Sequence, residues 1–565
     1  MKPSFVLRNT LRSVDHKGYP AYKGLRGTYQ FSSYLLNIHH VQGDPFASPS
    51  SLSLFISGKD AGFPQELYDT PWRRTAFQDH LLRLFGKQLN RLSFQAKGSG
   101  KSGLLATSSC GQEILERSAL QVNPKNGDIT ACFEAGFPAR GRTIDARSLE
   151  KMLFDLVPKA AEASLFYKAV CQEDLIRDIH LSDDQQYIRE QLPSLGLCAF
   201  VANGSILPRE SGVSQKPMKD SVPFVSPETY QITLTPPHCG SITGMRIPKG
   251  ITLIVGGGYH GKSTLLKALE LGIYNHIAGD GREYVITDDT AVKLRAEDGR
   301  SIRRTDISLF INDLPNGKDT TSFSTEDASG STSQAANTIE AIESGTSLFL
   351  IDEDTSATNF MIRDELMQRV VSRHQEPITP LIERIRYLYD SHGISSVLVA
   401  GSSGSFFHTA DHIIQMENYR PKDITEAAKT AAKDFPAVSI PKEAPHFPDF
   451  VRCFSPNKRL LGDRRVKIKV FGKDSVSINK ETIDLRYVEQ LADSEQTASL
   501  GYAFLYAQLH IMNGKKTLGQ VADEIMEQIR RHGLIFISGS SYPRTGLAMP
   551  RKQEILACIN RYRKL

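Results

Sequence analysis

The sequence has few cysteines, and they form no pattern that would hold a metal ion or a disulfide framework. Seven cysteines are scattered over 565 residues, and none of them form a CxxC pair. Zinc sites and disulfide-rich secreted domains both need cysteines at short, regular spacings. We therefore expect neither feature, and we expect a reducing compartment, the cytoplasm.

Long apolar runs are also missing. No stretch approaches the ~18 apolar residues that indicate a membrane-spanning helix, and the opening MKPSFVLRNTLRSVDHKG lacks the apolar centre of a signal peptide. We expect no membrane segment, so a membrane cargo would have to be reached through a partner. The composition, 40% hydrophobic and 23% charged, is that of a globular protein.

The net charge is only +5, but it is distributed unevenly. Residues 451–565 contain 20 Lys and Arg against 11 Asp and Glu, so this part carries +9 and the remainder −4. A basic C-terminal end favours an anionic partner. A solvated surface with surplus lysines would give the same count, so both interpretations remain open.

The order of expected elements divides the chain into domains. Strands and turns are expected over 1–70, a helix over 72–90, strands near 464–479, and helices near 484–511 and 517–531. The middle of the chain alternates strand and helix, which favours an α/β fold with a parallel sheet. We expect four parts: an α+β N-terminal domain (1–225), a nucleotide-binding core (226–420), a linker (421–450) and a basic α+β C-terminal domain (451–565).

A glycine-rich loop, 254-IVGGGYHGKSTLLKALELG-272, joins an apolar strand to a helix. Gly256, Gly261, Lys262 and Ser263 fit the pattern G-x-x-x-x-G-K-[ST]. In this pattern backbone amides surround phosphates, the lysine reaches the β- and γ-oxygens, and the hydroxyl binds Mg²⁺. The sequence therefore predicts a site for ATP and Mg²⁺. The expected nucleotide contacts are Gly256, Gly257, Gly258, Tyr259, His260, Gly261, Lys262, Ser263 and Thr264.

Three large side chains near this loop have open roles. Tyr259 and His260 could touch the nucleotide or serve only the loop itself. Tyr230 is a candidate to stack on adenine.

A second glycine-rich stretch, 98-GSGKSG-103, lacks the first glycine of the pattern and a following helix. It could contact phosphate or nucleic acid, or it could be a structural turn.

Two carboxylates follow an apolar run in 348-LFLIDEDTSATNF-360. Asp352 would bind Mg²⁺ together with Ser263, and Glu353 would orient the attacking water. With Lys262 as the second catalytic residue, this arrangement predicts an ATPase that releases ADP and phosphate. A P-loop kinase is a weaker alternative, because Glu353 beside Asp352 indicates water as the nucleophile.

A small-residue segment, 328-ASGSTSQAANTIEAIESG-345, opens a further expected helix. Ser329 precedes Asp352 by 23 residues, and a serine at a helix N-terminus suits anion recognition. The segment resembles the LSGGQ signature of ABC ATPases, in which the helix end contacts the γ-phosphate held by the opposite protomer. Ser329, Gly330 and Ser331 are the candidates for this contact, although a simple helix cap remains possible.

Phrases along nearly the whole chain resemble the family of predicted ATPases of the ABC class. They are VQGDPFASPS (41–50), GFPARGR (136–142), NGSILPR (203–209), GGGYHGKSTLL (256–266), ASGSTSQAAN (328–337), LIDEDTSATNFMIRD (350–364) and DLRYVEQLADSEQT (484–497). The resemblance implies an ABC-type P-loop ATPase core flanked by N- and C-terminal domains, and head-to-tail homodimers that enclose two ATP. It also implies a link to RNA, because the family includes proteins of RNA-editing complexes.

The chain departs from the wider ABC pattern at three places. Gly401, Ser402 and Ser403 stand in the region where a histidine usually follows the next strand. No glutamine occupies the expected Q-loop region 305–313, where Asp306, Ser308 or Asn312 could substitute. Only about twenty residues separate that region from Ser329, so a helical subdomain of transporter type should be much reduced. These departures leave the turnover rate open.

Basic residues suggest what the ATP serves. We expect an ATP-dependent homodimer whose outer domains bind nucleic acid, RNA rather than DNA, through phosphate contacts. The candidate residues are Arg140, Arg142, Arg464, Arg465, Lys467 and Lys469. The C-terminal tail adds Arg551, Lys552, Arg561, Arg563 and Lys564. The alternative is an ATP-dependent protein-binding switch, in which these residues only keep the surface solvated.

Overall fold

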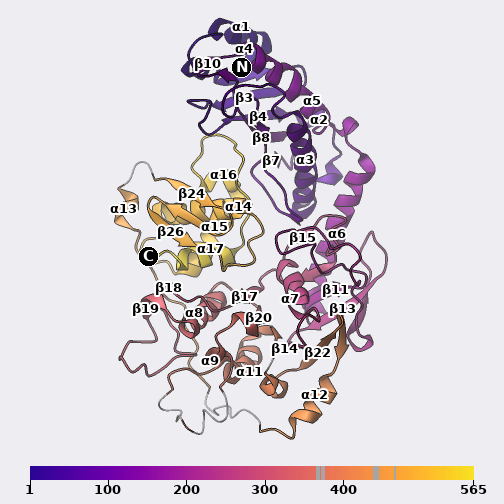
Figure 1. Ribbon diagram of the computed structural model, residues 1–565, viewed down its shortest axis with the longest axis vertical. Helices are drawn as coiled ribbons and strands as arrows, with labels where there is room; N and C mark the ends of the chain where they lie inside the picture. Colours follow the sequence, from indigo (N-terminus) through magenta and orange to yellow (C-terminus); the bar gives the residue numbers. More distant parts are fainter. Residues whose placement is uncertain (364–369, 371–375, 402, 437–443, 463–465) are drawn as a thin grey trace. The chain divides into compact units, whose positions relative to one another are not determined.

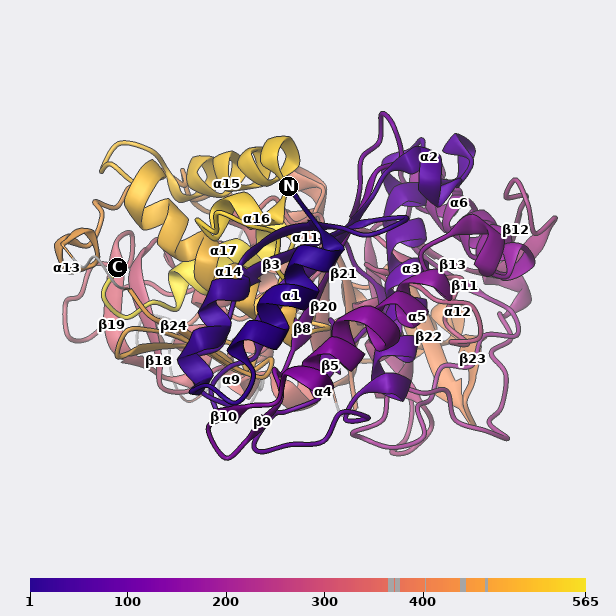
Figure 2. The ribbon, with the colours of Figure 1, turned by 90° about the horizontal axis from the view of Figure 1, so that it is seen from above.

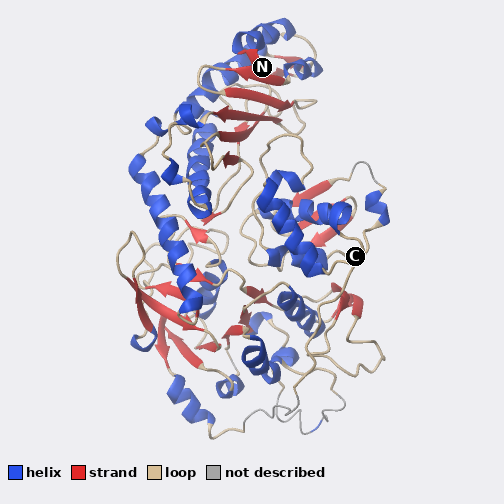
Figure 3. Cartoon of the chain, turned by 180° about the vertical axis from the view of Figure 1, so that it is seen from behind, coloured by secondary structure: helices blue, strands red, loops and turns tan. Residues whose placement is uncertain are grey.

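The computed structural model describes residues 1–363, 370, 376–401, 403–436, 444–462 and 466–565 (Figure 1). These residues form two compact units: unit 1 is 1–183 with 528–549, and unit 2 is 184–527 with 550–565. Both units mix helices and strands (Figure 3). The C-terminal residues are therefore divided between the two units.

Unit 1 is built on a mostly antiparallel sheet with the order β1-β2-β3-β4-β8-β5, in which β7 also pairs with β8. The strands of unit 1 are β1 (Lys2–Pro3), β2 (Gly27–Gln30), β3 (Leu35–His40), β4 (Ser50–Ile56), β5 (Leu105–Ala106), β6 (Glu113–Ile114), β7 (Leu120–Val122), β8 (Ile129–Ala135), β9 (Ala139–Arg140) and β10 (Thr143–Ile144). The residues of β4 and β8 are mostly buried, which explains their apolar composition.

The regular structure of unit 1 also includes helices. They are α1 (Ser4–Val14), α2 (Gly58–Ala61), α3 (Pro71–Leu92), α4 (Ala146–Lys151), α5 (Val157–Glu162) and α16 (Leu534–Ile537), while α6 (Gln172–Ser194) runs on into unit 2. The helix expected over 72–90 is confirmed as α3, which Thr70 caps by accepting a hydrogen bond from the amide of Arg73.

The expectation of strands and turns alone over 1–70 was wrong at its start. Leu7, Leu11 and Val14 are buried on one face of α1, because their spacing of three and four residues places them on one side of a helix. Helix α1 packs beside α4 (Figure 2).

Unit 2 contains the expected parallel sheet, with the order β17-β20-β21-β14-β22-β23. The strands are β17 (Val292–Leu294), β20 (Leu348–Asp352), β21 (Ser395–Val399), β14 (Ile251–Val255), β22 (His412–Glu417) and β23 (Arg420–Asp423). The pairs from β17 to β22 are parallel, and β23 is antiparallel to β22. Nearly every residue of the central strands is buried, so these strands read as continuous apolar runs in the sequence.

Other elements of unit 2 surround this sheet. The helices are α7 (Lys262–Leu271), α8 (Gly330–Glu343), α9 (Thr358–Met361), α11 (Leu381–His392) and α12 (Thr425–Ala432). The strands are β11 (Leu197–Ala202), β12 (Gln231–Leu234), β13 (Ile242–Pro248), β15 (Asn275–His276), β16 (Val285–Thr287), β18 (Arg300–Thr305) and β19 (Phe323–Ala328). Residues 306–329, all of them described, contain no helix. The helical subdomain is therefore reduced, as the sequence predicts.

The C-terminal part of unit 2, residues 466–527 and 550–565, carries a three-stranded antiparallel sheet. Its strands are β24 (Ile468–Phe471), β25 (Ser475–Ile478) and β26 (Glu481–Asp484); the helices near the C-terminus are α13 (Lys458–Leu461), α14 (Ser494–Tyr506), α15 (Leu518–His532) and α17 (Lys552–Asn560). The expected helix over 484–511 begins ten residues later than predicted, because Asp493 caps α14 in a capping box with Gln496. Among the described helices, none combines the length and the hydrophobicity that crossing a bilayer requires.

Candidate nucleotide site

The loop between β14 and α7 has a backbone that depends on glycine. Gly256 and Gly261 have φ angles of +142° and +97°. A Cβ atom on Gly256 would lie 2.4 Å from the carbonyl oxygen of Met416, whereas one on Gly258 would meet nothing within 4 Å. The first glycine is therefore required by both conformation and space, and the backbone at Gly258 stays open to approach.

Lys262 begins helix α7 and folds over the loop. Its ammonium group donates hydrogen bonds to the carbonyl oxygens of Gly256 at 2.6 Å and Gly257 at 2.8 Å. Gly261 is the N-cap and provides no side-chain cap, so the first amides of α7 can receive an anion. Ser263 is exposed and Thr264 is half-buried at the same helix end. The arrangement fits a bound triphosphate.

The two large residues of the loop differ in role. The Nδ1 atom of His260 accepts a hydrogen bond from the amide of Asn418 at 2.9 Å, and its carbonyl accepts one from the amide of Tyr419 at 3.1 Å. His260 therefore fastens the loop to the turn between β22 and β23. Tyr259 is 99% exposed with a φ of +64°. Its ring has no packing role to explain that strained conformation.

Tyr230 does not fit the expectation that it stacks on adenine. The residue is 4% exposed, and its hydroxyl is hydrogen-bonded to His412 at 3.2 Å and Thr425 at 3.1 Å. Tyr230 therefore packs in the core beside the His412 ring. The sequence could not show this, because a core tyrosine and a tyrosine that stacks on a base have the same local pattern.

Asp352 and Glu353 lie where β20 ends, and one strand, β21, separates β20 from β14. Because these strands are parallel, their carboxyl ends share the edge of the sheet that carries the glycine-rich loop. Asp352 is buried, and burial raises its pKa although the nearby Lys293 opposes that shift. Its Oδ1 accepts a hydrogen bond from the amide of Asp354 at 3.2 Å. The other oxygen of this carboxylate remains for a cation.

Glu353 is held by a contact that the sequence does not reveal. The backbone amide of Gly401, just after β21, donates to Oε2 of Glu353 at 2.7 Å. The loop in which a histidine is usually expected thus contributes its main chain. Glu353 is half-buried, so the carboxylate can reach both this amide and solvent.

Ser329 is the N-cap of α8 and is exposed, as the signature interpretation requires. Its hydroxyl is 3.0 Å from that of Thr332. A Cβ on Gly330 would lie 3.2 Å from Oδ1 of Asp298, so a larger residue would crowd this turn. Ser331, by contrast, is buried, so of the three candidates only Ser329 and Gly330 lie at the surface of the helix end.

Gln334 joins the signature helix to the segment after Asp352, and sequence reasoning missed it. Its Oε1 accepts a hydrogen bond from the amide of Ala357 at 2.8 Å, and its Nε2 donates to the hydroxyl of Ser356 at 2.9 Å. Gln334 is fully buried. A glutamine five residues beyond Ser329 carries no local signal of this contact.

The basic candidates separate into groups. Arg140 and Arg142 are exposed; Arg140 lies 3.4 Å from a carboxylate oxygen of Asp145, and Arg142 lies 2.9 Å from one of Asp44. Lys467 directly precedes β24 of unit 2 and Lys469 lies within it, and both residues are exposed. Arg464 and Arg465 lie outside the described residues.

The glycine-rich stretch 98–103 packs against the GFPARGR segment. The amide of Ser99 donates to the carbonyl of Ala139 at 2.8 Å, and the Ser99 hydroxyl accepts from the amide of Gly141 at 2.9 Å. The amide of Lys101 donates to the carbonyl of Pro45 at 2.9 Å. Three phrases that are far apart in the sequence therefore form one loop cluster in unit 1.

The tail arginines are less available than their position suggests. Arg561 is paired with Glu297 and Arg551 with Glu554, and the two arginine side chains are 9% and 14% exposed. Arg563 donates to the carbonyl of Gly299 at 2.9 Å. The tail is an internal contact here, so its expected role in nucleic-acid binding was wrong for Arg551 and Arg561.

Comparisons with known proteins cover most of the chain. Residues 6–168 match the model described as ATPase of the ABC class N-terminal, 171–448 match the P-loop domain model of ABC ATPases, and 467–565 match the MRB1590 C-terminal domain. The uncharacterized protein MJ1628 of Methanocaldococcus jannaschii is 31% identical over 288 residues, which are 49% of this chain and 62% of that protein. The match thus spans less than two thirds of this relative.

Two solved structures are similar at low identity. The ADP conformation of MJ1267, an ATP-binding cassette of an ABC transporter, is 13% identical and matches 34% of this chain and 88% of its own, with a TM-score of 0.23. The protein cbiO1 from Clostridium perfringens, part of the ABC transporter complex cbiONQ, is 13% identical and matches 36% and 89%, with a TM-score of 0.24. On the strength of the three family models, the chain belongs to the ABC-class P-loop ATPases, with the N-terminal domain of that class and a C-terminal domain of the MRB1590 type.

Proposed function

We propose that the protein hydrolyses ATP to ADP and phosphate. The observation that carries this proposal is the hydrogen bond from the Gly401 amide to Glu353, beside Asp352 at the loop edge of the sheet. A carboxylate held by a backbone donor is positioned to orient a water molecule and accept its proton. Lys262 and the amides at the start of α7 bind the phosphates, and their charge favours departure of ADP.

The residues present fit ATP with Mg²⁺. Gly256 and Gly261 take the positive φ angles of this loop, and a Cβ on Gly258 would meet nothing within 4 Å, so the loop backbone is open to the approach of phosphates. Ser263 and Asp352 would hold Mg²⁺, which when bound neutralises charge on the phosphate oxygens. Burial of Asp352 makes a cation there favourable, because a buried carboxylate gains from a counter-charge.

We infer that two copies of the chain associate head to tail on ATP. Helix α7 packs against β20 and β21, while α8 packs against β17, β18 and α17. Ser329 is exposed at the end of α8 and its helix N-terminus favours an anion. The γ-phosphate of the ATP that a second copy binds supplies that anion, so each nucleotide site is completed by Ser329 of the other copy.

We further propose that the outer domains bind RNA. The loop cluster of unit 1 places exposed cations beside exposed rings; Phe46 and Phe94 are 64% and 54% exposed. A Cβ on Gly100 would lie 2.9 Å from the Phe46 ring, and the amide of Phe94 donates to the carbonyl of Gly103. The exposed cations are Lys97, Lys101, Arg140 and Arg142. Cations for phosphates and rings for bases are what a single strand requires.

Sedimentation of the full chain with and without ATP and an RNA oligomer tests the proposal. We expect a dimer only with ATP, and an RNA complex that weakens steeply as salt rises. An ATP-dependent dimer that ignores RNA at low salt would reject the RNA role and indicate a protein-binding switch. A chain that hydrolyses ATP at a normal rate as a monomer would reject the shared site.

A further inference from the structure

The segment between β26 and α14 is bonded to the P-loop helix α7 and to the edge strand β17. The Gln490 side chain donates to the carbonyls of Glu270 and Ala291, both at 3.1 Å, and accepts from the amide of Lys293 at 3.0 Å. The backbone carbonyl of Gln490 accepts a hydrogen bond from the hydroxyl of Tyr274 at 2.9 Å. One buried side chain of the C-terminal part therefore ties the end of α7 to the edge of the sheet.

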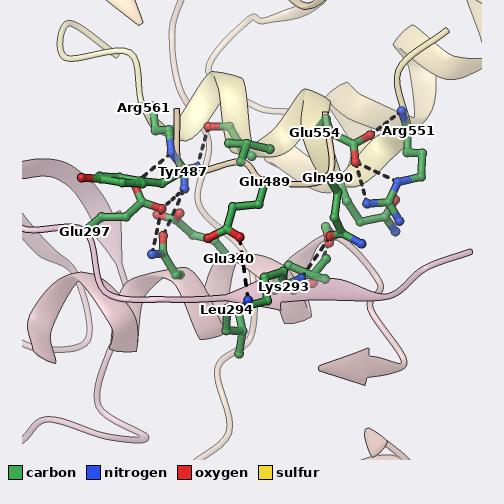
Figure 4. Close-up of a pocket in the computed structure, with 17 residues that line it drawn as sticks. Lys293, Leu294, Glu297, Glu340, Tyr487, Glu489, Gln490, Arg551, Glu554 and Arg561 are labelled. Atoms are coloured by element: carbon green, nitrogen blue, oxygen red, sulfur yellow. Dashed lines mark hydrogen bonds and ion pairs between the residues drawn. The ribbon is translucent and has the colours of Figure 1, made fainter. Parts of the chain in front are cut away.

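Charges reinforce this contact. One oxygen of Glu489 lies 2.6 Å from the guanidinium of Arg295, and the other lies 3.8 Å from the ammonium of Lys293 and 4.0 Å from that of Lys267 on α7. Burial disfavours ionisation of Glu489, but these cations outweigh it and hold the pKa below its ordinary value. Figure 4 shows Lys293 and Glu489 facing one another across the pocket.

The same C-terminal part is bonded to the signature helix α8. Asn337, Glu340 and Glu343 follow one another at intervals of three, so they share one face of α8. Arg561, which follows α17, is paired with Glu297 and lies 3.4 Å from the amide oxygen of Asn337. The side chain of Arg561 is 9% exposed, so removing it would take the directly paired counter-charge away from the buried carboxylate of Glu297.

A second arginine extends the contact along α8. Arg452 donates to Oε2 of Glu343 at 3.1 Å and to the amide oxygen of Asn560, the last residue of α17, at 2.9 Å. Arg300 is paired with Glu340. The face of α8 is therefore held by three buried arginines: Arg300, Arg452, which also bonds to the end of α17, and Arg561, which directly follows α17.

Gln490 and Arg561 line the same pocket, between the two sets of contacts. Figure 4 shows Arg561 with Glu297 at one end and Gln490 at the other, so the two residues act on different helices without touching each other. What joins them is the C-terminal part itself, in which α14 packs against both β24 and α17.

We propose that the C-terminal part is a brace that fixes the signature helix α8 relative to the P-loop helix α7, with Gln490 and Arg561 as its two positioning residues. The brace sets where Ser329 points when the P-loop binds nucleotide; this consequence rests on the proposed function. The brace itself does not, because its contacts are present in one chain. It also gives the C-terminal part a direct mechanical connection to the nucleotide site.

Amide hydrogen exchange of the full chain without nucleotide tests the brace. Gln490→Ala should increase exchange several-fold in α8, which Gln490 does not touch, and Arg561→Lys should do the same in α7. Matched controls are Gln186→Ala, whose amide bonds to Glu190 within α6, and Arg386→Lys, which pairs with Asp411. Tyr274→Phe removes only a hydroxyl from the α7 contact and serves if Gln490→Ala folds poorly. Changes confined to the helix that each side chain contacts would overturn the proposal.

A double-mutant cycle on ATP hydrolysis gives a second measurement. If either the Gln490 contact or the Arg561 contact is lost, the remaining one can no longer fix α8 relative to α7. The double variant should therefore hydrolyse ATP about as slowly as the slower single variant. Effects on kcat that multiply would show two independent packing roles and overturn the brace. We also expect Arg561→Lys to lower kcat while the KM for ATP changes less than about twofold. If the wild type does not hydrolyse ATP, but Gln490→Ala increases exchange in α8 and Arg561→Lys increases it in α7, the proposed function fails and the brace stands.

Discussion

The backbone amide of Gly401 donates a hydrogen bond of 2.7 Å to Oε2 of Glu353. A main-chain donor has no protonation state that changes near neutral pH, unlike the histidine usual in the wider ABC pattern. The orientation of Glu353 therefore does not depend on the protonation of its hydrogen-bond donor, and the loop after β21 needs no particular side chain to provide it.

Glu353→Gln should bind ATP as the wild type does and lose hydrolysis by about 10²-fold or more, because the amide keeps the Gly401 contact but cannot accept a proton. With ATP the variant should accumulate as a dimer, detected by size-exclusion chromatography. Asp354→Asn, which changes a neighbouring carboxylate, is the control. A Glu353→Gln protein that stays monomeric and hydrolyses ATP normally would contradict both roles.

Gly256→Ala should abolish nucleotide binding. The new Cβ would lie 2.4 Å from the Met416 carbonyl oxygen at a φ of +142°, so the loop must move. Gly212→Ala is the matched control, since Gly212 lies outside the loop and its Cβ would meet nothing within 4 Å. Titration with a fluorescent ATP analogue separates them; equal affinities would show that loop geometry does not set binding.

Ser329→Ala should weaken the ATP-dependent dimer and leave monomer affinity for ADP unchanged. A hydrogen bond to a charged oxygen contributes about 1.5–3 kcal/mol at each site, so the dimer dissociation constant should rise at least tenfold. Ser322→Ala, an exposed serine before β19, controls for loss of a surface hydroxyl. Analytical ultracentrifugation in the Glu353→Gln background provides the measurement, and an unchanged constant would remove Ser329 from the site.

Replacing Lys101, Arg140 and Arg142 together by alanine should weaken RNA binding and lower the salt slope by about 2, because three phosphate contacts are lost at about 0.7 each for single strands. Fluorescence anisotropy over a salt series measures both quantities. Alanine at Lys59, Lys125 and Lys168, three exposed lysines of unit 1, changes the charge equally. If both triple variants lose the same RNA affinity, the loop cluster contributes only through the overall charge of unit 1 and is not a binding site.

Glu297 links the stability of unit 2 to pH. Burial disfavours its ionised form, but Arg561 and Arg300 outweigh burial and hold the pKa below the usual value of about 4.3. A depressed folded pKa stabilises the protein above about pH 4.3, and that stability is lost as pH falls through the folded pKa. Glu297→Gln should therefore have a lower Tm than the wild type at pH 7, with the gap narrowing below about pH 4.

Calorimetry at several pH values measures this gap. Glu326→Gln, whose exposed carboxylate pairs with Arg303, should change the Tm little at either pH. A gap for Glu297→Gln that stays constant with pH would mean that lost packing, rather than charge, explains the destabilisation.

Local sequence patterns predict the parts of the site that a single stretch of chain can build. The strand before Gly256 and the helix after Gly261 are adjacent in sequence, and both occur where expected as β14 and α7. The apolar run ending at Asp352 is likewise a central strand. Tyr259 is exposed, as a loop residue should be.

Contacts between distant residues could not be predicted in this way. Gly401 reaches Glu353 across 48 residues, and Gln490 reaches Glu270 across 220. A backbone amide and a glutamine are common groups whose partners depend on how the strands are ordered, and nothing in their own neighbourhoods indicates it. The same reasoning explains Arg561, which reads as a basic tail residue and lies in a buried ion pair.

The amide of Gln490 stands in for a neighbouring strand along β17, at the margin of the sheet. Unpaired margins of this kind recruit other chains and promote aggregation. A shortened protein that ended before β24 would leave the N–H of Lys293 and the C=O of Ala291 available to any extended peptide. The C-terminal part thus also prevents pairing between the edge strands of different molecules. Truncated forms that keep only the core should be prone to self-association.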